Sequence, residues 1–150
     1  MNMRTFIFGQ IGKSPISHLI QKNTRKSNFP ESLVWSHVGA LVINESDWWI
    51  YESHFKAGGI IKHKFPDSKK HLEIYEYELN VEKLESLIGC EYGTKDVIDL
   101  AKWNLFSDKK NEKGYFCSEY IAICSDLEHV IKKPAHLITP HNIQCVLQSV

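Results

Sequence analysis

The chain has 150 residues and 43% hydrophobic side chains, and its 18 basic and 18 acidic residues give a formal net charge of zero. This length and composition suit one globular domain spanning residues 1–150. The balanced charge gives no indication of a nucleic-acid partner. No apolar run is long enough for a membrane span, and residues 1–8 are too short and too polar for a signal peptide. We therefore expect a cytoplasmic protein without stable membrane insertion.

Hydrophobic periodicity and turn residues predict the secondary structure. In chain order the pattern predicts a strand at residues 5–9, a helix opening at 14, a loop at 22–30, strands at 35–43, 48–53, 60–65 and 72–79, and helices at 80–88, from 94 or 95 to 105, at 117–130 and at 143–147. The second and third strands flank the turn-forming residues 44–47, so they should pair as an antiparallel hairpin.

The expected helices carry recognisable end signals. Ser14 and Asn80 can cap the first two helices, Pro15 suits a first turn, and Gly89 can end the second. The first helix presents an apolar stripe formed by Ile16, Leu19 and Ile20. A helix, antiparallel strands and then more helices predict an α+β fold with helices packed on one side of a sheet.

The most informative segment is residues 114–120, Gly-Tyr-Phe-Cys-Ser-Glu-Tyr. It places Cys117 where an aromatic loop gives way to an amphipathic helix, and a helix N-terminus favours thiolate over thiol. The competing interpretation is a small, buried, inert cysteine. Cys90, Cys124 and Cys145 are expected to be structural, and without a paired motif all four should be free thiols in a reducing compartment.

A histidine and an acid fall on the predicted hairpin. Because alternate residues of a strand share a face, the hairpin would bring His37 opposite Glu52 or His54, and the turn does not choose between them. A carboxylate beside His37 would fix its tautomer and stabilise its charged form. Cys117 should point toward the core at the end nearest these strands, so a thiol, an imidazole and a carboxylate can meet. Otherwise His37 is a core histidine and Glu52 a surface charge.

These segments resemble the permuted branch of the NlpC-type papain-like superfamily, the YiiX-like hydrolases. The main matches are Trp-Ser-His-Val-Gly at residues 35–39, Tyr51-Glu52, and Tyr-Phe-Cys-Ser-Glu at residues 115–119. Weaker matches lie at residues 16–20, 92–93 and 138–140. The order is histidine, acid and then cysteine, the reverse of the ordinary papain-like order.

The resemblance implies a circularly permuted papain-like fold and a cysteine peptidase or amidase. Cys117 would be the nucleophile, His37 the base, and Glu52 the residue that orients His37. Tyr92 would lie near Cys117 and help to hold the oxyanion, together with the backbone N–H of Cys117. The substrate would be an amide bond in a peptide or a peptide-like conjugate, such as a peptidoglycan fragment, cleaved through a thioacyl intermediate.

Two other functions fit the same residues. One is an acyl hydrolase or acyltransferase that acts on a lipid ester or thioester with the same nucleophile, and the other is a catalytically silent binding module. No metal or other cofactor is predicted, because Cys117 and Cys124 are seven residues apart, His136 and His141 are five apart, and no paired knuckle exists. The sequence leaves the substrate and the oligomeric state open.

Overall fold

The protein folds around a five-stranded sheet. Its structure is a computed structural model that describes residues 2–65, 72–94 and 114–149. The strands are β1 (Met3–Gln10), β2 (His37–Asn44), β3 (Asp47–His54), β4 (Gly59–Lys64) and β5 (Glu73–Glu76). They lie in the order β4-β3-β2-β1-β5, and each neighbouring pair is antiparallel. The expected α+β class is confirmed.

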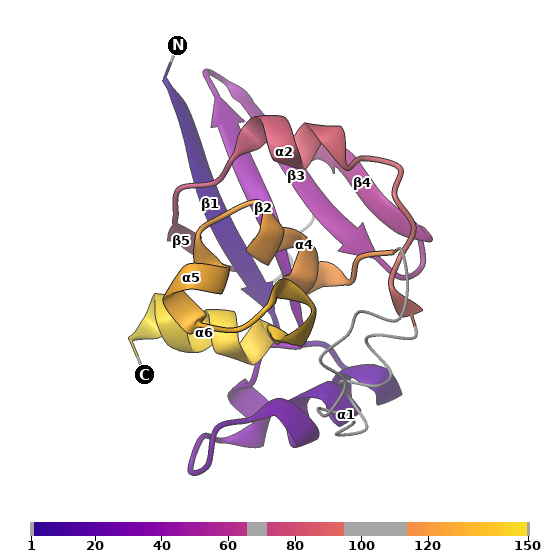
Figure 1. Cartoon of the computed structure of the whole chain (residues 1–150), viewed down its shortest axis with the longest axis vertical. Helices are drawn as coiled ribbons and strands as arrows, with labels where there is room; N and C mark the ends of the chain where they lie inside the picture. The colour runs from indigo at the N-terminus through magenta and orange to yellow at the C-terminus, as the bar shows by residue number, and fades with distance from the viewer. Residues whose placement is uncertain (1, 66–71, 95–113, 150) are drawn as a thin grey trace.

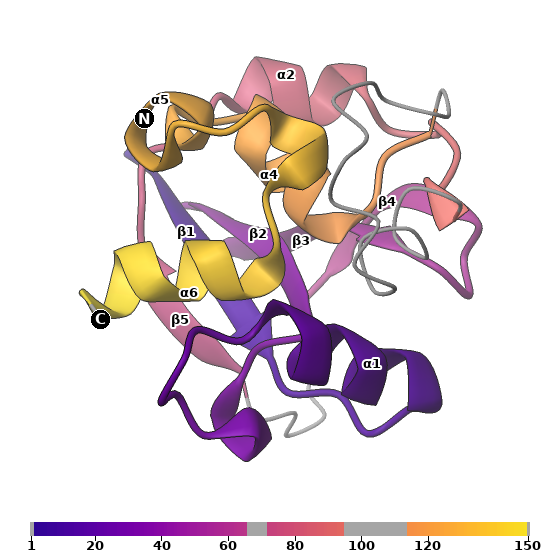
Figure 2. The same ribbon diagram turned by 60° about the horizontal axis from the view of Figure 1, so that its bottom comes forward.

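The described helices form two groups according to their position relative to the sheet. They are α1 (Pro15–Thr24), α2 (Val81–Ser86), α4 (Cys117–Ile123), α5 (Leu127–Ile131) and α6 (Pro140–Gln148), with 3-10 turns at Glu31–Leu33 and Ala135–Leu137. Figure 1 shows α2, α4, α5 and α6 over one face of the sheet. In Figures 1 and 2, α1 lies beyond the end of the sheet where β1 ends and β2 begins. None of these helices is long and apolar enough to span a lipid bilayer.

The sheet buries different residues on its two faces, as strand alternation requires. The main core lies between the sheet and the helices and includes Val38 and Ala40 from β2 with Tyr120 and Ile121 from α4. A smaller cluster on the other face consists of Phe8, Leu41 and Ile50. Burial of one such side chain stabilises the fold by about 1.5–3 kcal/mol, so the first cluster contributes most to holding α4 on the sheet.

The hairpin and the helix caps match the sequence. β2 and β3 are joined through the Asn44–Asp47 pair, and Glu45 in the turn has a positive φ of 56°. The side-chain oxygens of Ser14 and Asn80 cap α1 and α2, as expected.

The first helix is longer and less buried than the sequence predicts. α1 runs to Thr24, into residues that were expected to form a loop. Ile20 of the expected apolar stripe is buried, but Leu19 is 44% exposed. Gln21 is buried instead, and its Nε2 donates a hydrogen bond to the Val34 carbonyl at 3.2 Å. Helix α1 is therefore anchored partly by the polar side chain of Gln21 and not by its apolar stripe alone.

The single helix expected at residues 117–130 is two helices, α4 and α5. At the break, the Cys124 carbonyl accepts a hydrogen bond from the Asn80 N–H at 2.8 Å. The Ser125 hydroxyl donates to the Ile121 carbonyl, also at 2.8 Å. These bonds occupy carbonyls that a continuing helix would use, so α4 ends here and α5 begins as a separate helix.

Two further elements are shorter than expected. β5 stops at Glu76, because the Thr5 hydroxyl takes part where the backbone ladder would continue: it donates to the Tyr77 carbonyl at 2.6 Å and accepts from the Leu79 N–H at 3.1 Å. α2 ends at Ser86, two residues before the predicted end. Outside the described residues lie the expected turn at 66–70, the loop at 106–113 and the helix opening at 94 or 95, apart from Thr94 itself.

A close approach between Gly9 and Trp35 fixes the start of β2. A Cβ at Gly9 would lie 2.1 Å from the Trp35 ring, so only glycine leaves room for the buried indole. The indole Nε1 donates to Glu73 Oε2 at 2.8 Å, and the Trp35 backbone N–H donates to Gln144 Oε1 at 3.0 Å. The chain is therefore held from several sides two residues before His37.

We predict that Gly9→Ala lowers the free energy of unfolding by about 1–3 kcal/mol, because the added methyl group must displace the indole. Urea unfolding followed by circular dichroism measures the loss. In a Trp35→Leu background, where the indole is absent, the same substitution should cost less than half as much. Equal costs in both backgrounds would show that the contact with Trp35 is not the cause.

Candidate active site

His37 is the first residue of β2 and pairs with Gln10 at the end of β1. The preceding Ser36 donates its N–H to the Gln10 carbonyl at 3.0 Å, and its hydroxyl accepts from the Gly12 N–H at 2.8 Å. The backbone is therefore fixed immediately before the imidazole. The His37 side chain keeps 21% of its exposure, so it reaches the surface from a mainly buried position.

Glu52 lies near the end of β3, and its side chain is only 12% exposed. Continuing the β2–β3 pairing by one step from Ala40 and Tyr51 brings Gly39 opposite Glu52. A Cβ at Gly39 would lie 3.2 Å from the Glu52 Cβ and 2.3 Å from the Phe8 ring. Glycine at this position therefore leaves the space in which the Glu52 side chain packs on the sheet.

The carboxylate of Glu52 meets His37 diagonally across the two strands. His37 Nε2 lies 3.8 Å from Glu52 Oε2, and His54 Nε2 lies 4.0 Å from Glu52 Oε1. The His37 and His54 rings are 6.0 Å apart between centroids. Of the two residues that the sequence left open, the continued register places His54 opposite His37 and Glu52 diagonal to it. Glu52 is nevertheless the residue that brings a carboxylate oxygen beside His37.

Cys117 is the first residue of α4 and is 3% exposed. The buried Glu119 caps the helix start by accepting a hydrogen bond from the Phe116 N–H at 3.3 Å. Ser53, the neighbour of Glu52 on β3, donates its hydroxyl to the Tyr115 carbonyl at 2.5 Å. This bond joins the strand that carries the acid to the segment that carries the thiol.

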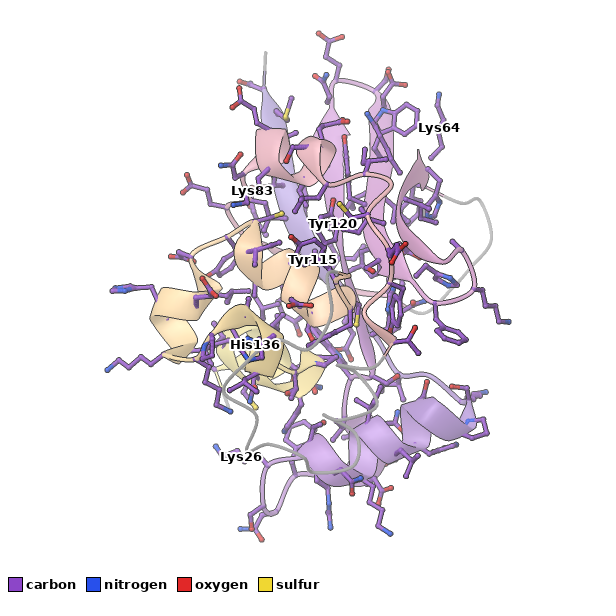
Figure 3. The ribbon with its side chains drawn as sticks, turned by 45° about the vertical axis from the view of Figure 1, so that its right-hand side comes forward. Lys26, Lys64, Lys83, Tyr115, Tyr120 and His136 are labelled. Carbon is purple, nitrogen blue, oxygen red and sulfur yellow. The ribbon has the colours of Figure 1, made fainter. Side chains whose placement is uncertain are left out.

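Helix α4 is further fixed from within the core. Tyr120 donates its hydroxyl to the Leu84 carbonyl and Ser118 donates to the Ile138 carbonyl, at 2.8 and 2.7 Å. Tyr115 and Tyr120, labelled in Figure 3, both pack into the cluster between the helices and the sheet. The position of Cys117 is thus set by packing and hydrogen bonds on both sides of the thiol.

The electrostatics join the three side chains. Burial of the His37 imidazole acts to lower its pKa, but the nearby Cys117 and Glu52 side chains and their negative charges outweigh burial and raise the pKa to about 10. Burial acts to raise the pKa of Glu52, yet the contacts and charges of His37, followed by His63 and His54, hold that pKa below its ordinary value. His37 is therefore charged at neutral pH between two groups that favour the imidazolium.

Tyr92 lies near the same thiol, on a loop held against the segment before α4. The Tyr115 N–H donates to the Glu91 carbonyl at 2.9 Å, and a Cβ on Gly114 would lie 2.7 Å from the Tyr92 backbone. Burial and the negative charge of Cys117 raise the pKa of Tyr92. The phenol therefore keeps its proton and can donate a hydrogen bond, as an oxyanion donor must.

A cavity of about 570 Å³ adjoins His37 and Tyr92. Its walls include Ile11 and Ile20 near α1 and the exposed Phe55 in the turn after β3, whose ring contacts that of Tyr92 at 5.6 Å between centroids. This volume lies within the range of small-ligand pockets, and apolar walls with a few polar groups are typical of them. Cys117 is not part of the wall, whereas His37 and Tyr92, whose pKa values Cys117 raises, both are.

Two cysteines outside the candidate site, Cys124 and Cys145, are held in the thiol form. All four are unpaired, as expected. Burial raises the pKa of Cys124 to about 12 and also raises that of Cys145, so both keep their protons at neutral pH. Within residues 2–65, 72–94 and 114–149, no group of three or more histidine, cysteine or acidic side chains is arranged to hold a metal ion.

Sequence reasoning missed His63, whose Nε2 lies 3.8 Å from Glu52 Oε2. The strand around His63 was predicted, and alternation shows which residues share its face. However, no local signal gives the register between β3 and β4, and only that register brings His63 to Glu52.

No family model, curated protein or solved structure matches the chain. The site must therefore be interpreted from the geometry and chemistry of its own side chains.

We predict that NMR titration of labelled histidines will find the His37 imidazole charged throughout neutral pH. Cys117→Ala should lower its titration midpoint by at least about one pH unit, since the thiol makes the largest favourable contribution to the charged form. Glu52→Gln should lower the midpoint less. His37→Gln identifies the resonance, and a wild-type midpoint near 6.5 that responds to neither variant would contradict the described electrostatics.

Proposed function

We propose that the protein is a cysteine hydrolase of the permuted NlpC-type papain-like class, acting on an amide bond in a peptide or peptide-like conjugate. The observation that carries the proposal is that the thiol of Cys117 and the carboxylate of Glu52 both act on the imidazole of His37. The resemblance adds the order of the three residues, with the histidine and acid on adjacent strands and the cysteine at a helix start.

The first chemical requirement is an activated nucleophile. A free thiol is largely protonated at neutral pH, and a neighbouring imidazolium favours the thiolate. His37 Nε2 faces Glu52, which leaves Nδ1 as the ring nitrogen for the Cys117 proton. At 3.8 Å the contact with Glu52 is longer than a hydrogen bond, and such contacts commonly tighten when substrate binds.

The reaction then proceeds through two acyl transfers. The Cys117 sulfur attacks the scissile carbonyl carbon, and the imidazolium of His37 gives its proton to the departing amine as the C–N bond breaks. His37, now neutral, removes a proton from water, whose oxygen attacks the thioester carbon. The C–S bond breaks, the carboxylic acid leaves, and the proton on His37 restores the ion pair. Glu52 keeps the imidazole oriented throughout.

The negative oxygen formed in each transfer needs donors. The backbone N–H of Cys117 and the hydroxyl of Tyr92 supply them in this proposal, because the first belongs to the reacting residue and the second keeps its proton near the thiolate. Loss of one such donor typically lowers the rate by about 10²–10³-fold.

A second candidate function is an acyl hydrolase or acyltransferase on a lipid ester or thioester. The cavity beside His37 favours it, because Ile11, Ile20 and the exposed Phe55 offer an apolar wall that could accept an acyl chain. The nucleophile and base would be the same. Peptidyl and fatty-acyl chloromethyl ketones, compared by intact mass, distinguish the two substrates according to which one labels Cys117 faster.

We predict that iodoacetamide labels Cys117 selectively at about pH 6, below the ordinary cysteine pKa. Peptide mapping by mass spectrometry gives the rate at each cysteine, and Cys124, with its raised pKa, is the internal control for a protonated buried thiol. His37→Ala should remove the selectivity, since the imidazolium is lost.

Hydrolysis supplies the second criterion. Cys117→Ala should abolish turnover of any accepted peptidyl or acyl substrate, whereas Cys124→Ala should leave turnover within a few-fold of wild type in the folded protein. If Cys117 reacts no faster than Cys124 at pH 6, or if Cys117→Ala hydrolyses the substrate normally, the proposed function is wrong.

A further inference from the structure

Glu52 is met by three imidazoles, although the proposed chemistry uses only one. His37 and His63 approach the same oxygen, Oε2, each at 3.8 Å, and His54 approaches Oε1 at 4.0 Å. They come from β2, β4 and β3, so they belong to the two strands that flank the acid and to its own strand. Side chains from every strand paired with β3 thus face this carboxylate.

The strand register explains why His63 reaches Glu52. In the β3–β4 pairing Glu52 is opposite Ile61, and Ile50 is opposite His63. Directly opposed residues share a face, and so do residues two apart, so His63 lies on the face of Glu52 and diagonal to it. His37 lies diagonal to Glu52 on the other side, toward the opposite end of β3. The carboxylate is therefore held between two imidazoles that approach from opposite directions along the strand.

This arrangement has a consequence for the orientation of the acid. A glutamate side chain has several rotatable bonds, and an acid that orients a catalytic histidine must keep one oxygen toward that ring. The His63 side chain is 39% exposed, so its imidazole is anchored at the rim and reaches inward to Oε2. In the described part of the chain His37 and His54 line the cavity and His63 does not, so His63 is placed to act on Glu52 and not on a ligand.

We propose that His63 is a positioning residue, which holds Oε2 of Glu52 toward His37. This inference rests on the proposed function, because it assigns His63 a role in the orientation of His37. His63 Nδ1 lies 3.2 Å from the Lys64 carbonyl, which can only accept a hydrogen bond, so Nδ1 is the donor there and Nε2 presents an N–H to Glu52 in the imidazolium form. His63 acts on Cys117 only through Glu52 and His37.

The test uses the full chain and two readouts that need no known substrate: the rate of Cys117 alkylation by iodoacetamide at about pH 6, and the NMR titration midpoint of His37. His63→Ala should lower the alkylation rate by about two- to fivefold, the loss expected from one partly exposed ion-pair contact. It should also lower the His37 midpoint, because the carboxylate no longer stays on the imidazolium.

The direction of the midpoint change separates positioning from simple charge repulsion. If His63 were only a nearby positive charge, its removal would make His37 easier to protonate and would raise the midpoint. His63→Gln keeps an N–H donor without a titrating group, so it should restore both readouts. Lys64→Ala is the matched control, since it removes a cation from the next residue of β4 that pairs with Asp47 at 3.7 Å and not with Glu52.

Each outcome decides a separate point. A raised or unchanged midpoint in His63→Ala overturns the role of His63 whatever the alkylation rate, and so does an unchanged alkylation rate, provided that wild-type reactivity still depends on His37. If wild-type reactivity does not depend on His37, the proposed function fails and this inference fails with it. Should His63→Ala not fold, as judged by urea unfolding, His63→Leu repeats the comparison with more of the side-chain volume retained.

Discussion

The position of the His37 imidazole between Glu52 and Cys117 constrains how the other elements are placed. An imidazolium removed from water is unfavourable unless opposite charges or acceptors meet it, and here they come from two different layers. Glu52 belongs to the sheet and Cys117 to a helix packed on it. The layers must therefore be held in register to within about 0.5 Å if the three groups are to work together. Many of the contacts around the site serve this requirement.

Hydrogen bonds that cross between elements supply most of that precision. The hydroxyl of Ser53 joins β3 to the segment before Cys117, while Ser118 and Tyr120 tie α4 to the last turns of the chain and to α2. A single such bond contributes only about 0.5–1.5 kcal/mol, but a buried partner left unsatisfied costs more. Polar groups buried on both sides of Cys117 therefore select one placement of the helix and disfavour others nearby.

The local features of the fold could be predicted from the sequence, and the long-range ones could not. The hairpin that carries His37 and Glu52 and the helix start at Cys117 follow from periodicity and turn residues. The diagonal approach of Glu52 to His37 needed a register that the turn did not specify. The break after α4 has the same origin, because Asn80, distant in sequence, occupies the carbonyl of Cys124.

The candidate site shows the same division between local and distant information. Residue types and their order indicated the thiol, the base and the acid. His63 was missed because it carries no motif and reaches Glu52 only through the pairing of β3 with β4. Likewise, the burial of Gln21 in place of Leu19 depends on a carbonyl that the first helix meets only after the chain has folded back. Helix periodicity alone cannot find such a partner.

The two charged groups of the site respond to pH with opposite sign. The pKa of His37 is raised, so its contribution to stability is full below its ordinary value of 6.5 and is lost as the pH rises through about 10. The pKa of Glu52 is lowered, so its contribution is full above its ordinary value of 4.5 and is lost as the pH falls through the folded value. Both contributions are therefore complete only between about 4.5 and 6.5.

At neutral pH part of the stabilisation from His37 is already lost, while the imidazolium itself persists. A site selected for stability alone would have little use for this arrangement, since well-packed apolar residues commonly replace buried ion pairs at no cost. A charged imidazole beside a thiol is what nucleophilic catalysis requires in this same pH range. The arrangement of charges therefore supports the proposed nucleophilic role of Cys117 more than a purely structural one.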